Sequence, residues 1–124
     1  MVPGGISMGC QGQRDSGELL VEAARAYIEA HSAEKFSLQV ISDALFVNGS
    51  YLLRLFKART GHTLLGYHNW VRCEKAKVLL CDKSISISAA GEAVGFVSSA
   101  HFSHVFRKIV GMTPTVFRAS NMKQ

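Results

Sequence analysis

Residues 50–63 and residues 100–113 carry the same pattern of side chains, about fifty positions apart. The first segment reads SYLLRLFKARTGHT, and the second reads AHFSHVFRKIVGMT. Apolar residues, a cation, a glycine and a threonine recur in register, as in Leu52 with Phe102, Lys57 with Arg107 and Gly61 with Gly111. A solenoid needs three or more repeats to bury a continuous core. Two copies therefore indicate two small modules of one kind.

The apolar residues of the chain follow the helical period, and no segment alternates as a strand does. The sequence therefore predicts an all-α protein. Seven helices are expected, at about residues 15–30, 38–45, 49–60, 64–81, 87–94, 98–110 and from 114 onward. In the first of these helices the predicted core stripe is Leu19, Leu20, Ala23, Ala26, Tyr27 and Ala30.

Capping residues mark the ends of these helices. Ser37 and Thr63 precede helical patterns and can accept a hydrogen bond from a free backbone N–H. Asp15 stands three residues before Glu18, the spacing of a capping box. Glycine is a common helix stop, and Gly61, Gly95 and Gly111 follow apolar helical runs. Thr113 is the expected cap of the last helix, with Pro114 at its first position.

The repeat extends to the helix before each copy, with an offset of 49 instead of 50 residues. Leu38, Ile41, Leu45 and Val47 match Ile87, Ala90, Val94 and Phe96. The second turn must therefore contain one additional residue. This is the pattern of two helix-turn-helix units joined by a long helix. The expected organisation is a first unit at 15–62, a linker helix at 63–82 and a second unit at 83–124.

Composition limits the possible partners. The chain has 124 residues and a net charge of +5, which favours polyanions. No apolar run reaches the roughly 18 residues needed to cross a membrane. The three cysteines include no CxxC pair, and we expect reduced thiols in a cytoplasmic protein. Residues 1–14 are glycine-rich and polar, as in a flexible linker or an expression remnant.

The outward faces of the two matched helices are polar and cationic. On a helical wheel, Ser50, Arg54 and Lys57 point away from Leu52 and Phe56. Small residues at the start of a helix and cations further along suit insertion into a DNA major groove. Cationic helix faces are more often simply solvated. The alternative is a helical protein-interaction module without direct DNA readout.

The ordered motifs of this chain closely resemble the DNA-binding domain of AraC/XylS-type transcription regulators, over residues 17–120. The matching elements are the segment from Ser50 to Lys57, Arg72 with Glu74-Lys75-Ala76, Val94-Gly95-Phe96, and the segment from Phe106 to Pro114. The resemblance implies seven helices and two recognition helices in successive major-groove segments. It also implies sequence-specific binding to double-stranded DNA, with RNA polymerase as a further partner of an activator. Oligomerisation and effector binding would belong to a domain absent from this chain.

The resemblance also assigns individual residues. The implied base readers are Ser50, Leu53 and Arg54 in the first unit, and Ser99, Ala100, His101, Ser103 and His104 in the second. Lys57 and Arg107 are more suited to phosphates. The sequence departs from the family pattern at Phe46, where glycine is usual, so a positive φ there would be strained. Gly91 stands where alanine is usual, which predicts a loosely held fifth helix.

Three further interpretations concern single side chains. Arg72 fits an internal ion pair between helices better than a phosphate contact. His101 and His104 lie three apart, but no acid or thiol is near in sequence, and we expect no metal or cofactor. No nucleophile with a base and no phosphate-cradling glycine loop is recognisable. We therefore do not expect an enzyme.

Overall fold

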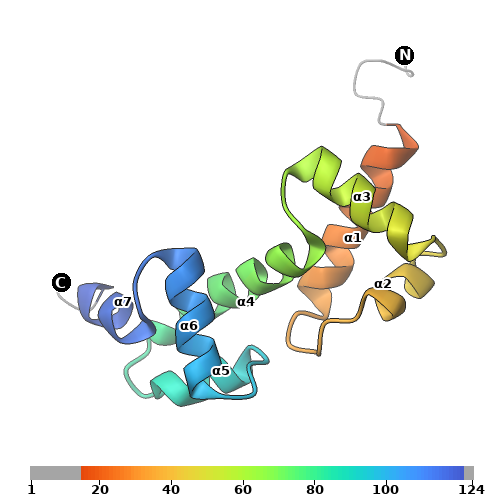
Figure 1. Ribbon diagram of the computed structural model, residues 1–124. Helices are drawn as coiled ribbons and strands as arrows, with labels where there is room; N and C mark the ends of the chain where they lie inside the picture. The colour runs from red at the N-terminus through yellow and green to blue at the C-terminus, as the bar shows by residue number, and fades with distance from the viewer. Residues whose placement is uncertain (1–14, 122–124) are drawn as a thin grey trace, which may run out of the picture.

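The computed structural model describes residues 15–121 and consists, over that range, of seven helices connected by short loops (Figure 1). The predicted all-α class is confirmed. The predicted linker at 1–14 lies outside the described residues. The helices are α1 (Ser16–Ala30), α2 (Leu38–Ala44), α3 (Gly49–Thr60), α4 (Leu64–Leu80), α5 (Ile87–Ala93), α6 (Ser99–Val110) and α7 (Pro114–Asn121).

Local capping explains why the helix boundaries agree closely with the sequence prediction. In each of α1 to α6 the N-cap oxygen accepts a hydrogen bond from the N–H three residues later; the caps are Asp15, Ser37, Asn48, Thr63, Ser86 and Ser98. The N–H of Glu18 and the side chain of Arg59 hold the pKa of the Asp15 carboxyl below its usual value. Gly61 and Gly111 end α3 and α6 with φ of 81° and 98°. Glycine adopts this left-handed conformation without steric cost.

The predicted core stripe of α1 is only partly right, because Leu20 and Tyr27 pack at the edge of the first core and its other members are exposed. The buried side chains of α1 are Val21, Ala24 and Ile28, whereas Leu19 is 53% exposed. Helix α1 is rich in alanine, so apolar residues occupy much of its circumference and periodicity alone cannot select one face. The face that packs is the one carrying Val21 and Ile28, which bury more apolar surface than alanines can.

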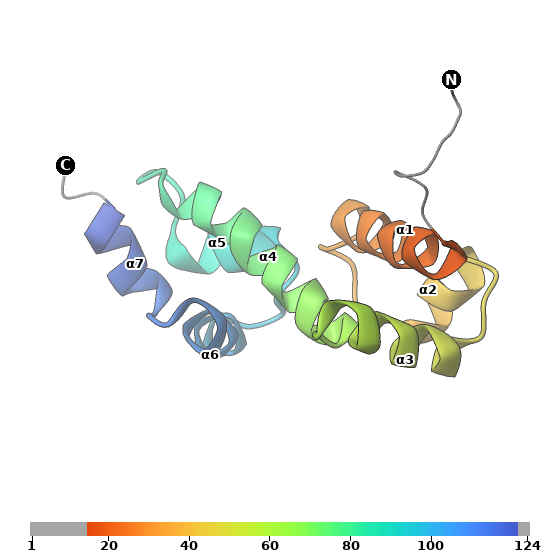
Figure 2. The same ribbon diagram turned by 90° about the horizontal axis from the view of Figure 1, so that it is seen from above.

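Helix α4 crosses the whole molecule and serves two separate hydrophobic cores (Figures 1 and 2). Its first half gives Leu64 and Val71 to a cluster formed with α1, α2 and α3. Its second half gives Cys73, Ala76 and Leu80 to a cluster formed with α5, α6 and α7. We refer to α1–α3 as the first unit and to α5–α7 as the second unit.

The turns inside the two units have the same construction. Val47 N–H donates to Ser42 O, and Phe96 N–H donates to Gly91 O, both at 3.0 Å. The residue before each donor has a positive φ, 59° at Phe46 and 109° at Gly95. The condition for backbone strain at Phe46, a positive φ, is therefore met. The additional residue expected in the second turn is Val97, which is almost fully exposed.

The expectation that Gly91 loosens α5 is not supported. Gly91 is buried, and a Cβ placed on it would lie 2.5 Å from Cδ2 of Phe102. The missing side chain lets α5 approach α6 closely. Glycine here serves packing between helices, although it remains a poor helix former by itself.

Arg72 links helices, but not through the ion pair that was expected. Its Nε donates to the carbonyl oxygen of Ser32 at 2.7 Å, and its Nη2 donates to that of Glu34 at 2.8 Å. The neighbouring His68 is 3% exposed, and its Nε2 is buried without a hydrogen-bond partner within residues 15–121. Arg72 therefore satisfies two carbonyls in the loop between α1 and α2, which would otherwise lack partners.

Burial of His68 should make the protein less stable at mildly acidic pH. Desolvation, with the nearby charge of Arg72, lowers the pKa of His68 to about 4. Below pH 6.5 His68 binds a proton in the unfolded chain but stays neutral in the folded protein. The free energy of unfolding therefore falls as the pH drops toward 4, by about 1 kcal/mol per pH unit. Urea unfolding between pH 7 and pH 4.5 measures this slope. His68→Gln should flatten it, while His62→Gln, at an exposed histidine, should not.

Candidate nucleic-acid interface

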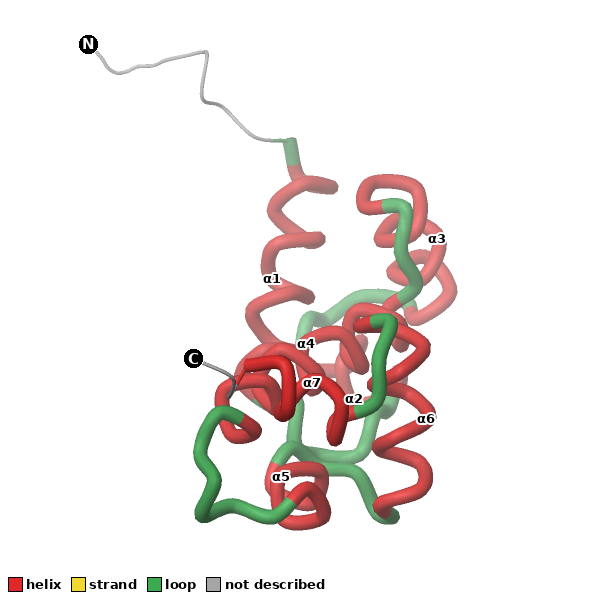
Figure 3. The backbone as a smooth tube through the Cα atoms, turned by 90° about the vertical axis from the view of Figure 1, so that its left-hand side faces the viewer, coloured by secondary structure: helices red, strands yellow, loops and turns green. Residues whose placement is uncertain are grey.

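Helices α3 and α6 lie on the same side of the molecule. Figure 3, a view turned by 90° from Figure 1, shows both along one edge, and Figure 2 shows both along the lower edge of the molecule. Each is the second helix of its helix-turn-helix unit and follows a turn of the same construction. The two predicted recognition helices can therefore face one ligand together.

The outward face of α3 carries the predicted residues. Leu52 and Phe56 are fully buried in the first core. Ser50, Arg54 and Lys57 are exposed, and Leu53 is 40% exposed on their flank. The helix is anchored by its apolar stripe, so its polar stripe is free for a partner.

In α6 the predicted residues divide into free and packed positions. Ser99, Ala100, His104 and Arg107 are exposed, and Ser103 is half-buried. His101 is exposed but its ring packs edge-on against Phe96, with centroids 5.4 Å apart. The start of α6 is thus tied to the interior, in contrast with the start of α3.

The cations on this face are not neutralised by neighbouring acids. Within residues 15–121, Arg54, Lys57 and Arg107 form no ion pair. The ion pairs of that part of the chain lie elsewhere, as between Arg59 and Asp15 or between Lys77 and Glu74. Unpaired cations on an exposed helix face attract phosphates.

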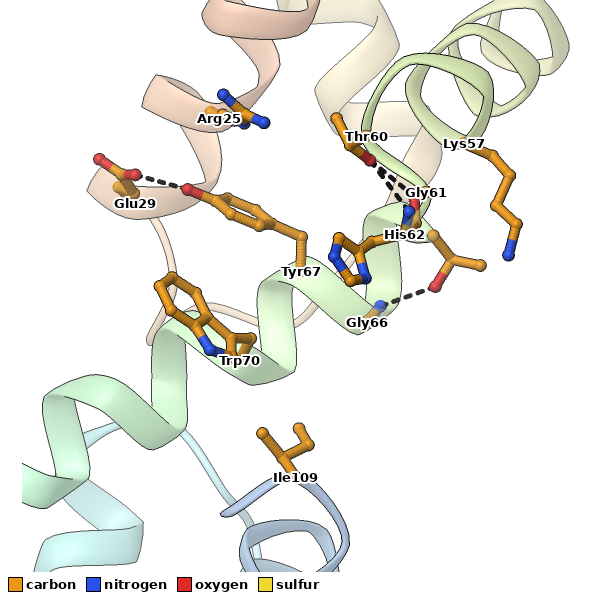
Figure 4. Close-up of a pocket in the computed structure, with 11 residues that line it drawn as sticks. Arg25, Glu29, Lys57, Thr60, Gly61, His62, Gly66, Tyr67, Trp70 and Ile109 are labelled. Carbon is orange, nitrogen blue, oxygen red and sulfur yellow. Dashed lines mark hydrogen bonds between the residues drawn. The ribbon is translucent and has the colours of Figure 1, made fainter.

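An open groove of about 870 Å³ separates the two units on one side of α4. Figure 4 shows Tyr67 directed toward Glu29, Trp70 further along α4, Lys57 near the α3–α4 turn, and Ile109 from α6. The Tyr67 hydroxyl donates to the Glu29 carboxylate at 2.6 Å. Burial, and to a smaller extent this hydrogen bond, raises the pKa of Tyr67 to about 12. Among the predicted residues only Lys57 lines the groove. The groove could not be recognised in the sequence, because the residues that line it come from helices that are distant in sequence.

The described residues form no cluster of metal-ligand side chains. Between residues 15 and 121 no group of three or more His, Cys, Asp or Glu side chains could hold a metal ion. Cys73 and Cys81 are free thiols, one buried and one exposed. No helix in that range is long and apolar enough to span a membrane. What the geometry provides is two sets of exposed polar residues, one on α3 and one on α6.

This fold and these two exposed helices define a helix-turn-helix protein, and the comparisons agree. A family profile described as "Helix-turn-helix domain" matches residues 41–120. A solved transcriptional regulator from Chromobacterium violaceum, described as containing an AraC-type DNA-binding domain, is 32% identical with a TM-score of 0.79. That similarity covers 86% of this chain and 95% of the other. The chain belongs to the AraC-type family of transcription regulators and carries its DNA-binding domain.

Two other proteins place the domain in context. The arabinose operon regulatory protein of Escherichia coli is 33% identical over 100 residues, 80% of this chain but 34% of that protein. The chain thus spans about a third of the length of this curated relative. The DNA-binding domain of AdpA, solved in complex with a target DNA, has the same fold at 23% identity, with a TM-score of 0.73, over 81% of this chain and 90% of that one.

The interface residues should contribute little to stability. Alanine at Arg54, Lys57, His104 or Arg107 should change the free energy of unfolding by no more than about 0.5 kcal/mol, because these side chains are exposed. Phe56→Ala, in the first core, should cost about 3 to 5 kcal/mol. Urea unfolding of the five variants checks both values. A loss above 2 kcal/mol at Arg54 would mean that it supports the fold.

Proposed function

We propose that the chain reads an asymmetric DNA site of about twenty base pairs with two recognition helices. The observation that carries this proposal is the placement of α3 and α6 on one side of the molecule. Recognition helices in adjacent major-groove segments are separated by about one helical turn, roughly 34 Å. Because the two units differ in sequence, the two half-sites should differ as well.

The proposed contacts follow the exposed faces. Ser50, Leu53 and Arg54 of α3 contact bases in one half-site, with Arg54 donating two hydrogen bonds to a guanine. In the other half-site the contacts come from Ser99, Ala100, His101, Ser103 and His104 of α6. Lys57 and Arg107 contact phosphates, which position the protein without selecting sequence.

The proposed division of the chain is a first subdomain at 15–62, a linker helix at 63–82 and a second subdomain at 83–124. The separate hydrophobic clusters at the two ends of α4 support it. In the full-length protein we expect effector binding and oligomerisation to reside in another domain. We expect activation through contact with RNA polymerase, in the cytoplasm, as the family resemblance implies. Nothing in the proposed site calls for an enzymatic activity.

Binding to DNA should depend strongly on salt. Each phosphate neutralised by a lysine or arginine contributes about −0.9 to the slope of log K against log salt, so we expect a slope of roughly −4 to −8. Fluorescence anisotropy with a genomic fragment between 50 and 300 mM salt gives this slope. An affinity that does not change with salt, or no binding at low salt, would favour a protein-interaction module instead.

The first unit should carry most of the sequence specificity. Arg54→Ala should cost about 1 to 3 kcal/mol on the preferred site and relax one base preference, because a bidentate contact is lost. Lys57→Ala and Arg107→Ala should weaken preferred and random DNA almost equally. Selection from a random DNA pool with each variant measures these effects. If His104→Ala erases a preference and Arg54→Ala does not, the second unit is the dominant reader.

A further inference from the structure

The two units meet on the side of α4 opposite the groove only through short segments of the described chain. Every extensively packed pair of helices lies within one unit or includes α4. The loop between α1 and α2, residues 31–37, lies beside the turn between α5 and α6, as Figure 1 shows. Contact there is close, because a Cβ placed on Gly95 would lie 2.5 Å from the carbonyl oxygen of Ala33.

Arg72 occupies the centre of this junction. It is 7% exposed, and its guanidinium donates to the carbonyl oxygens of Ser32 and Glu34 in the first unit's loop. The same guanidinium lies 5.1 Å from the ring centroid of Phe96 in the second unit's turn. Hydrogen bonds from a charged donor are strong, and a cation over an aromatic ring is attractive. One side chain of α4 therefore contacts both units at once.

Lys75 and His101 extend the junction in two directions. Lys75, one turn after Arg72, donates from Nζ to Glu29 O and to Ser32 Oγ, both at 2.7 Å. On the other side, Phe96 carries the edge-on ring of His101, near the start of recognition helix α6. A continuous series of contacts thus connects the end of α1 with the start of α6.

We propose that Arg72 is a positioning residue that, with Gly95 and Phe96 seated on the α1–α2 loop, fixes the distance and angle between the two recognition helices. This inference rests on the proposed two-site reading of DNA. One inserted base pair displaces a half-site by about 3.4 Å and rotates it by about 35° around the DNA axis. With the junction intact, the second unit cannot follow the displaced half-site. If α4 alone joined the two units, they could pivot relative to each other and follow it.

Arg118 supplies a matched control. Its guanidinium donates to the carbonyl oxygens of Leu80, Asp82 and Ile85, all within α4 and the loop that follows it. Arg118→Gln thus removes the same kind of bond as Arg72→Gln without touching the junction between the units. A general effect of losing a guanidinium that bonds backbone carbonyls appears in both variants, whereas a positioning effect appears in Arg72→Gln alone.

The first experiment measures the distance between the units directly, without DNA. Spin labels are attached at Ala58→Cys in α3 and Lys108→Cys in α6, both exposed, with Cys10 and Cys81 replaced by serine. Cys73 stays, because it is buried and its pKa is raised to about 11 by burial, so it does not react with the label. Double electron–electron resonance spectroscopy measures the distance between the two labels. The distance distribution should be narrow for the parent and for Arg118→Gln, and at least twice as broad for Arg72→Gln.

The second experiment measures the consequence for DNA. Sites selected from a random pool are lengthened by one or two base pairs between the half-sites, and binding is followed by fluorescence anisotropy. The parent and Arg118→Gln should lose at least tenfold in affinity for one inserted base pair. Arg72→Gln should lose less than threefold, with unchanged affinity for an isolated half-site. Arg72→Lys, which keeps the charge but not the two-point bonding, should fall between them.

Equal distance distributions in Arg72→Gln and the parent overturn the inference, and so does equal broadening in Arg118→Gln. If no DNA is bound, the proposed function fails while the distance measurement still decides the junction. If circular dichroism shows that Arg72→Gln does not fold, Phe96→Leu takes its place, since it keeps an apolar side chain in the second core and removes the ring under the guanidinium.

Discussion

The structure depends on the burial of α4 from two different directions. Its first half packs into one cluster and its second half into another, so the helix has no single apolar face. Chains of about fifty residues bury too little surface to be more than marginally stable alone. Neither unit has a sufficient core without its half of α4. The shared helix thus makes two small modules into one molecule and sets both recognition helices on one side of it.

Local chemistry explains how much of the fold was predictable from the sequence. Helix starts at Asp15, Ser37 and Thr63, and stops at Gly61 and Gly111, depend on bonds within four residues. Such bonds can be recognised in a sequence without knowing the rest of the fold. The internal repeat predicted two units of the same kind. The change of its offset from 49 to 50 residues predicted the additional residue in the second turn.

Features that depend on distant residues were not predictable in this way. The buried face of α1 is chosen by the helices it meets, and the role of Gly91 is set by Phe102. Arg72 was recognised as structural, yet its partners are backbone carbonyls, which leave no signature in side-chain identity. The exposed positions of the recognition helices followed from periodicity, because one clear apolar stripe fixes the opposite face. Their contacts with bases remain predictions.

The same turn position meets opposite demands in the two units. Gly95 lies against the backbone of Ala33, where any side chain would collide, and its φ of 109° suits glycine. Phe46 also has a positive φ at the same position of its turn, but its side chain is 93% exposed and collides with nothing. Its left-handed backbone costs about 1 to 2 kcal/mol, without further loss from packing. The repeat could therefore diverge at this position in the first unit and not in the second.

This difference has a consequence for recognition. The start of α3 depends on its own cap and its own core, since the first unit's turn is exposed at Phe46. The start of α6 is connected through His101 and Phe96 to Arg72, and through Arg72 to the loop of the first unit. Both recognition helices pack against α4, and the start of α6 has this additional connection to the loop of the first unit. The proposed reading of two half-sites in a fixed register depends on these contacts, because α4 alone would let the two units pivot and change the separation of their recognition helices.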